Sequence, residues 1–213
     1  MRELDTGTPQ LLARVDNGVG WLELNNPERR NAITTAMQRA VPAVLVAFSD
    51  DPRVHVVVLT GAGDRAFASG ADAAEFEQTR STDAGRVEYD VVLAAFWSAW
   101  ASFDKPTIAM IRGYCIGGGL LLALQADIRV AEIGSEFAVA AAGVGAGLAS
   151  WGVEAVLAVV GPARAAEMLF SARRLSAQEA FAIGLVNRVV PGHELEQVTR
   201  DLAATIAANA TAA

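Results

Sequence analysis

Short apolar runs alternate along the chain with longer stretches in which apolar positions recur every three or four residues. Runs that are apolar, mostly β-branched and bounded by turn residues are typical of strands. They cover Leu11–Val15, Val19–Leu24, Val54–Thr60, Ala66–Asp72, Pro106–Ile111, Ile128–Ala131 and Leu185–Val190. The helical period predicts helices over Thr34–Ser49, Val87–Phe103, Leu120–Gln125, Val153–Val160, Ala163–Phe170, Ser176–Ile183 and Glu194–Ala208. Strands that alternate with helices predict an α/β fold.

Local signals fix several of these boundaries. Asn17-Gly18 between two apolar runs predicts a hairpin. Ser176 with Glu179 matches a capping box and therefore predicts a helix start. Gly161-Pro162 separates two helical stretches, and no linker divides the chain before that point. We therefore expect one domain over residues 1–213.

Composition narrows the class of protein. Of the 213 residues 53% are hydrophobic, which predicts a large core or apolar surface buried between subunits. The net charge of −7 argues against a nucleic-acid partner. One cysteine, Cys115, and two distant histidines predict neither a disulfide nor a metal site. The polar N-terminus and the short apolar run Gly117–Ala126 predict a cytoplasmic protein without membrane insertion.

Two glycine-containing loops follow predicted buried strands. Gly117-Gly118-Gly119 stands directly before an apolar helix, where unpaired N–H groups and a partial positive charge suit a phosphate or an oxyanion. Phe67–Asp72 is a second loop of this kind. Taken alone, the triplet fits a tightly packed turn equally well. It matches neither nucleotide-phosphate motif, because no G-x-G-x-x-G pattern and no Walker lysine is present.

The order of motifs resembles the crotonase superfamily, the enoyl-CoA hydratase/isomerase family. The matching segments are NPERRNA at 26–32, VVLTG at 57–61, FASGAD at 67–72, KPTIA at 105–109, GYCIGGG at 113–119, ADIRVA at 126–131 and GLVNRVV at 184–190. The resemblance implies a spiral of repeated β-β-α units with a core at about 8–190. It also implies a homotrimer or a hexamer, and an acyl-CoA ligand without a further cofactor.

The resemblance also assigns candidate site residues. The backbone N–H groups of Ser69 and Gly118 would form an oxyanion hole for the thioester oxygen. The candidates for coenzyme A binding lie near the N-terminal motif and are Arg30, Ala32, Ala71 and Asp72. Trp151 is a further candidate, as a wall of the pocket. Asp72 has an alternative interpretation as a loop cap, and Arg29 as a merely solvated side chain.

The chain departs from the family where the chemistry is concentrated. Hydratases of the family place glutamates at the positions of Leu121 and Ala141, and neither residue here can act as an acid or a base. Glu75, Glu136 and Glu154 are the nearest alternative acids. The family also continues into further C-terminal helices. This fold is therefore expected to be truncated in the C-terminal helical region, of which only the start is present, at about 191–213.

Three functions remain open at this point. The first is a hydratase/isomerase-type enzyme whose chemistry depends on the oxyanion hole. The second is a non-catalytic acyl-CoA carrier or binding protein, favoured by the two apolar replacements. The third is a subunit that keeps the fold only for assembly, which the high apolar content favours weakly.

Overall fold

The computed structural model describes residues 1–72, 74–75, 82–145 and 147–210, and it confirms the α/β class. A larger sheet has the strand order β1-β2-β3-β4-β6-β8-β11 and becomes parallel from β3 onward. Its strands are β1 (Arg2–Leu4), β2 (Leu11–Asp16), β3 (Val19–Leu24), β4 (Val56–Gly61), β6 (Thr107–Ile111), β8 (Ile128–Glu132) and β11 (Arg188–Val190).

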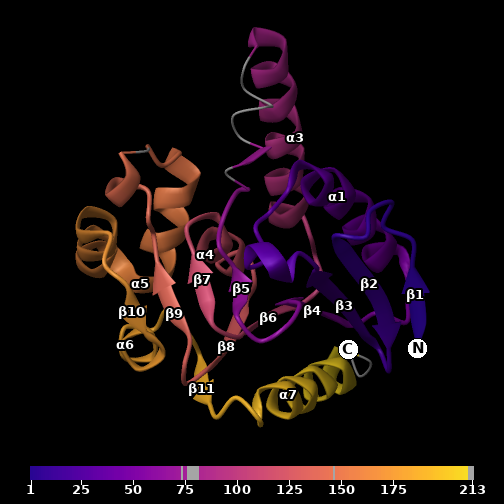
Figure 1. The fold of residues 1–213 in the computed structure, drawn as a ribbon. Coiled ribbons are helices and arrows are strands. Elements are labelled where there is room, and N and C mark those ends of the chain that lie inside the picture. The colour runs from indigo at the N-terminus through magenta and orange to yellow at the C-terminus, as the bar shows by residue number, and fades with distance from the viewer. Residues whose placement is uncertain (73, 76–81, 146, 211–213) are drawn as a thin grey trace.

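A smaller sheet stands beside the larger one (Figure 1). Its order is β10-β9-β7-β5, with β5, β7 and β9 parallel and β10 antiparallel at the edge. Its strands are β5 (Ala66–Ala68), β7 (Tyr114–Ile116), β9 (Glu136–Ala138) and β10 (Leu175–Ser176). The sequence analysis did not predict β1, β7, β9 or β10.

The two sheets are built by a repeated β-β-α unit. In each unit the first strand joins the larger sheet, the second joins the smaller sheet, and a helix follows. The units are β4-β5-α3, β6-β7-α4 and β8-β9-α5, with α3 at Asp83–Ala101, α4 at Gly118–Ala123 and α5 at Ser150–Ser171. Both sheets keep the units in the same order, so the expected spiral is confirmed.

The residues that predicted element boundaries adopt the expected turn, caps and helix break in the structure. Asn17 and Gly18 both adopt positive φ, as a two-residue hairpin turn demands. The hydroxyl of Thr34 accepts from the N–H of Met37 and caps α1 (Thr35–Asp50). Ser176 and Glu179 form the capping box of α6 (Ala177–Ala182). The break at Gly161, where φ is +74°, bends α5 between its two predicted halves.

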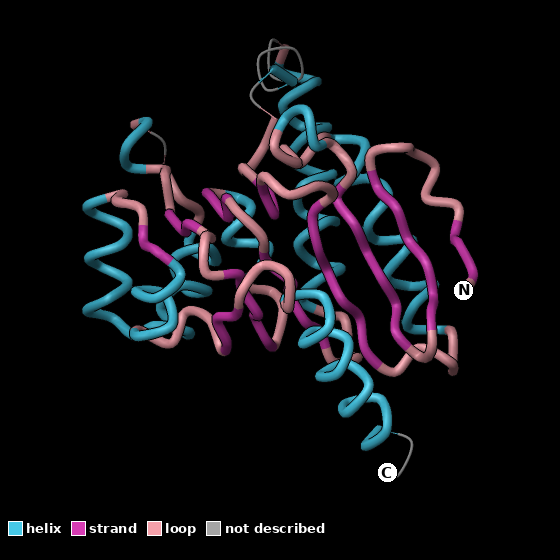
Figure 2. The backbone as a smooth tube through the Cα atoms, turned by 60° about the horizontal axis from the view of Figure 1, so that its bottom comes forward, coloured by secondary structure: helices cyan, strands magenta, loops and turns pink. Residues whose placement is uncertain are grey.

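Helices cover both faces of the larger sheet. Leu22, Leu24, Val57 and Leu59 point to the main core, which α1 and α3 help to close. On the other face α7 (Leu195–Ala210) crosses the strands, as Figure 2 shows, and covers Trp21. No helix in the described part of the chain is long and apolar enough to cross a bilayer.

Candidate functional site

The two glycine loops meet at the carboxyl ends of β5 and β7 in the smaller sheet. β5 and β7 are adjacent and parallel, so the loops that follow Ala68 and Ile116 leave the sheet side by side. A Cβ added to Gly70 would lie 3.2 Å from the backbone nitrogen of Gly118. The loops therefore touch through backbone atoms, and a side chain at position 70 would separate them.

Packing against β5 explains a second glycine of the triplet. A Cβ at Gly119 would lie 2.3 Å from the carbonyl oxygen of Ala68. Gly117 has φ of +56°, and its N–H donates to the carbonyl of Ala138 at 2.8 Å. Both interpretations of the triplet therefore apply, because the same residues that pack tightly also bring the start of α4 against the β5 loop.

Hydrogen bonds hold the loop after β5 in place but leave one of its backbone N–H groups without an acceptor among the described residues. The N–H of Ile33 donates to the carbonyl of Gly70 at 2.7 Å, and the N–H of Asp72 donates to the carbonyl of Ile33 at 3.1 Å. The Ser69 hydroxyl donates to the carbonyl of Arg29 at 3.3 Å. Within the described residues the backbone N–H of Ser69 meets no acceptor, and that of Gly118 lies in the unpaired first turn of α4. Two unpaired donors thus stand at the junction of the two loops.

A buried amide locks the N-terminal motif onto the β4–β5 turn. Asn31 is fully buried, and its Nδ2 donates to the carbonyls of Ala62 and Ala66 at 2.9 and 2.7 Å. Its Oδ1 accepts from the N–H of Asn26 at 3.0 Å. The sequence analysis quoted Asn31 within a motif but gave it no role. Its backbone is left-handed, with φ of +53°, a conformation that asparagine adopts more readily than most residues, so an asparagine inside the motif was the only signal in the sequence.

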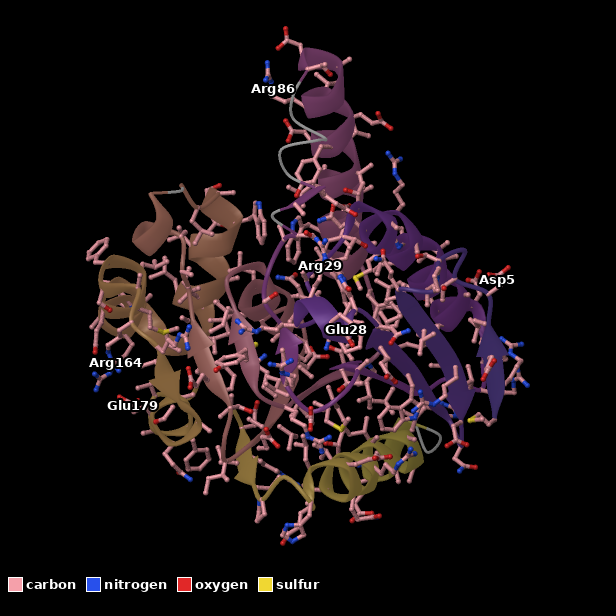
Figure 3. All side chains as sticks on the ribbon, viewed as in Figure 1. Asp5, Glu28, Arg29, Arg86, Arg164 and Glu179 are labelled. Carbon is pink, nitrogen blue, oxygen red and sulfur yellow. The ribbon has the colours of Figure 1, made fainter. Side chains whose placement is uncertain are left out.

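Asp72 acts as a loop cap and as an ion-pair partner. Its carboxylate accepts from the N–H of Ala74 at 2.9 Å and from Arg29 Nη1 at 2.9 and 3.1 Å. Arg29 is therefore paired and not merely solvated. Figure 3 shows Arg29 and Glu28 on η1 (Pro27–Arg29), in the middle of the face beside β5. Glu75, one of the alternative acids, accepts from the N–H of Thr35 at 2.7 Å at the start of α1.

Two guanidinium groups contact the Tyr114 ring. Arg30, which is exposed, and Arg174 lie 5.4 and 5.3 Å from its centroid. Arg174 pairs with Glu136 at 2.9 Å, and that hydrogen bond and charge raise the pKa of Arg174. Glu136 is thereby held in an ion pair outside the loop junction. Ala32 is buried under this region, and Ala71 is exposed and bridges to Ile33.

The positions of the two family glutamates lie in apolar surroundings. Leu121 is 4% exposed. A Cβ added to Gly152 would lie 3.3 Å from Leu121 Cδ1, so the leucine packs directly on this glycine. Ala141 directly precedes the short helix η2 (Ala142–Val144). Trp151 packs on Trp97 with ring centroids 4.4 Å apart. Glu154 is exposed on α5.

Other reactive groups lie away from water or are dispersed. Cys115 is fully buried, and burial raises the pKa of its thiol, which disfavours the nucleophilic thiolate. Among the described residues no group of three or more histidine, cysteine or acidic side chains is placed to hold a metal ion. The backbone donors at the loop junction are therefore the groups best placed for chemistry.

The comparison with known proteins decides the family. A family model described as enoyl-CoA hydratase/isomerase matches residues 14–213. The chain belongs to the enoyl-CoA hydratase/isomerase family. A crotonyl-CoA hydratase of Syntrophomonas wolfei is 34% identical over 87% of this chain and 70% of its own length. A short-chain-enoyl-CoA hydratase of Clostridium acetobutylicum is 31% identical over 92% of this chain and 74% of its own.

Solved structures of the family share the fold. An enoyl-CoA hydratase/carnithine racemase from Magnetospirillum magneticum superimposes with a TM-score of 0.89 and 34% identity, covering 94% of this chain and 75% of that one. An enoyl-CoA hydratase/isomerase family protein from Hyphomonas neptunium gives a TM-score of 0.88 at 33% identity, covering 95% and 78%. The family and the crotonase fold expected from the motifs are thus confirmed.

Proposed function

We propose that this member of the enoyl-CoA hydratase/isomerase family binds acyl-CoA thioesters with the carbonyl oxygen between the N–H groups of Ser69 and Gly118. The contact of the two glycine loops carries this proposal. Donors fixed by the fold stabilise negative charge on an oxygen without reorganising, and a thioester oxygen gains such charge as an enolate forms. Both N–H groups lack an acceptor within the described residues, so a ligand oxygen would complete their hydrogen bonding.

The coenzyme A moiety is assigned to the surface beside this junction. Arg30 is exposed and forms no ion pair within the described part of the chain, so its charge is available to a phosphate. Ala32, Ala71 and Asp72 border the same region. Asp72 contributes chiefly by holding Arg29 and the loop, because its carboxylate is already engaged by both.

We further propose that the chain does not catalyse ordinary hydration. Addition of water to an enoyl thioester needs one group to deprotonate the water and one to protonate the α-carbon. Leu121 and Ala141 supply neither, and Glu75 and Glu136 are bound to other partners. What remains is thioester binding with oxyanion stabilisation, which suits enolate chemistry that brings its own leaving group, such as decarboxylation.

A non-catalytic acyl-CoA carrier is the second candidate. The burial of Leu121 in apolar packing favours it, because this position then offers no polar group to a bound thioester. The two candidates differ in one observable. An oxyanion hole that acts on substrate accelerates the loss of carbon dioxide from a bound 2-carboxyacyl thioester, because the electron pair of the broken C–C bond becomes the enolate, which solvent then protonates. A carrier leaves that loss at the solution rate.

The first test is a titration with crotonyl-CoA that follows binding heat and enoyl absorbance together. We expect binding with no loss of absorbance. Steady turnover at ordinary enzyme rates would overturn the assignment of Leu121 and Ala141 as inert. Absence of binding to any CoA thioester would overturn the proposed function as a whole.

The donors are tested by Gly118→Pro, which removes one N–H. Thioester binding should weaken by about tenfold or more, since a hydrogen bond to a partly charged oxygen contributes about 1.5–3 kcal/mol. Gly134→Ala is the matched control, because a Cβ there would meet only the Glu132 carboxylate, at 3.8 Å. Unchanged binding by a folded Gly118→Pro variant would remove the central claim.

A further inference from the structure

The chain contains a single lysine. Of its 17 lysine and arginine residues only Lys105 carries an amine, and all the others carry guanidinium groups. A guanidinium stays protonated at ordinary pH and is a poor nucleophile, whereas a lysine amine is a common target of acylation. Lys105 is therefore the one side chain of this sequence that can form a stable amide with an activated acyl group.

Lys105 is tied to the end of α1. It lies two residues before β6, and its Nζ donates to the carbonyl of Phe48 at 2.6 Å and to that of Asp51 at 2.8 Å. These carbonyls belong to the last turn of α1 and its C-cap, where carbonyl groups lack helical partners and a positive charge is favoured. The ammonium group thus caps α1, and this cap uses two of its three N–H donors.

The residues on both sides of Lys105 are held in place as well. Ser49 Oγ donates to Asp104 Oδ1 at 2.9 Å, which ties the preceding residue to α1. The N–H of Val57 donates to the carbonyl of Pro106 at 2.8 Å, which ties the following residue to the larger sheet. Lys105 itself is half-buried between these segments. An acyl donor that approaches the folded chain therefore meets an amine whose backbone and head are both engaged.

Amide formation needs the nitrogen that this cap occupies. When a thioester acylates an amine, the neutral amine adds to the carbonyl carbon and the C–S bond breaks. The thiolate leaves with the electron pair, and the proton lost by nitrogen passes to that thiolate or to water. Lys105 must leave both carbonyls before its nitrogen can attack. Each hydrogen bond from a charged group shifts such an equilibrium by about tenfold or more.

We propose that Lys105 is a protected acylation site, which a CoA thioester modifies only when the last turn of α1 opens. The inference rests on the proposed function for the source of the acyl group, because a chain that binds acyl-CoA carries an activated thioester with it. Acylation would also remove the charge of Lys105 and leave one N–H donor in place of three. The acylated side chain could not restore the cap, so the modification would mark chains that have opened there.

The protection is measured against a lysine on the open surface of the same molecule. Arg188→Lys provides this reference, because Arg188 is exposed on β11. The variant is incubated with butyryl-CoA in mildly alkaline buffer, and peptide mass spectrometry compares butyrylation at the two positions. In the folded chain Lys105 should react more slowly than the added lysine by about tenfold or more. In urea the two rates should be equal.

A second change opens the cap without altering the lysine. Asp51 is buried, and its carboxylate accepts from the N–H, Nε and Nη2 of Arg53 at 3.0, 2.9 and 2.8 Å, which fixes the turn after α1. Asp51→Ala, made together with Arg188→Lys, should raise the butyrylation of Lys105 severalfold relative to the added lysine. Asp50→Ala is the matched control, because Asp50 is the adjacent acid and is exposed. Thermal melts establish that both variants are folded.

The cost of modification to the fold is read from Lys105→Gln. Its neutral amide stands in for the acylated side chain, so its urea midpoint should fall below that of the parent. Lys105→Arg keeps the positive charge and should retain more of the midpoint. Equal midpoints for the parent and Lys105→Gln would overturn the capping role of Lys105.

The outcomes separate this inference from the proposed function. A folded chain that butyrylates Lys105 as fast as the added lysine overturns the protection, and so does a difference that persists in urea or that Asp51→Ala leaves unchanged. The series is repeated with sulfo-N-hydroxysuccinimidyl acetate, an acyl donor that needs no coenzyme A site. Equal rates with this reagent also overturn the protection. Failure of every CoA thioester to bind in calorimetry overturns the proposed function, and the result with this reagent then still decides whether the fold protects Lys105.

Discussion

Asn31 shows how one buried amide can position a site that it does not enter. Its side chain satisfies two carbonyls and one N–H, and these connect the N-terminal motif to the strand that leads into the Ser69 loop. Removal of the side chain would take the amide donor from the carbonyls of two buried residues, Ala62 and Ala66, and the acceptor from the half-buried N–H of Asn26. Each unsatisfied buried group costs about 1–3 kcal/mol.

Asn31→Ala should therefore lower the free energy of unfolding by about 3 kcal/mol or more, measured by urea denaturation. Asn25→Ala is the control, since Asn25 makes a single exposed hydrogen bond to the carbonyl of Pro9 at 2.8 Å. A loss of less than about 1 kcal/mol in Asn31→Ala would show that water replaces the amide, and that the motif is held by other contacts.

Gly119→Ala tests the approach of α4 to β5. The new methyl group would meet the backbone of Ala68, with the carbonyl oxygen 2.3 Å away, and backbone cannot move aside as a side chain does. We expect a loss of about 1–3 kcal/mol in stability, together with weaker thioester binding because the Gly118 donor shifts. A variant that matches the parent in both urea midpoint and crotonyl-CoA affinity would contradict this account.

At the scale of elements, the capping box of α6 should be visible as acid sensitivity. Hydrogen bonds from Ser176 and Arg173 lower the pKa of Glu179 from its ordinary 4.5 to about 2. Because the pKa of Glu179 is lower in the folded than in the unfolded state, its ionised carboxylate stabilises the protein at pH values above about 4.5. This stabilisation is lost as the pH falls from about 4.5 towards 2. Glu179→Gln should flatten the decline of stability in that window. A decline of unchanged slope in thermal melts at pH 5, 4 and 3 would contradict this.

The same scale shows which elements a sequence can predict. Long runs such as Val54–Thr60 and the period of Thr34–Ser49 predicted their strand and helix, because many positions agree. β7 and β9 have three residues each, and β9 begins with a charged Glu136. Such strands form because neighbours in the spiral pair with them, which is a non-local cause that no short window contains.

The candidate site likewise contains residues that the sequence could predict and contacts that it could not. Motif order located Ser69, Gly118, Leu121 and Ala141, since their positions relative to glycines and strands are fixed. The pairing of Arg29 with Asp72 links residues 43 positions apart, and Arg30 and Arg174 reach the Tyr114 ring from distant parts of the chain. Both depend on how elements pack, so residue patterns alone did not reveal them.

At the scale of the whole molecule, the apolar content predicts subunit contacts. Val87 and Val91 are 65% and 64% exposed on α3, whose N-terminal part extends from the body in Figure 1. We expect a homotrimer or a hexamer, hence a mass in light scattering of three or six times 22.2 kDa. A monomer at micromolar concentration would contradict this expectation and the assembly-subunit hypothesis with it.

The crossing of α7 over the larger sheet has a consequence for biosynthesis. Val19 and Trp21 emerge from the ribosome well before α7, yet Leu195, Ala203 and Ala207 of α7 complete their cover. At ordinary translation speeds this interval lasts about 10–35 s. Until α7 is made, one face of the growing sheet stays open to water, to other nascent chains and to chaperones, so a ribosome that stalls before Leu195 would leave a chain prone to aggregation.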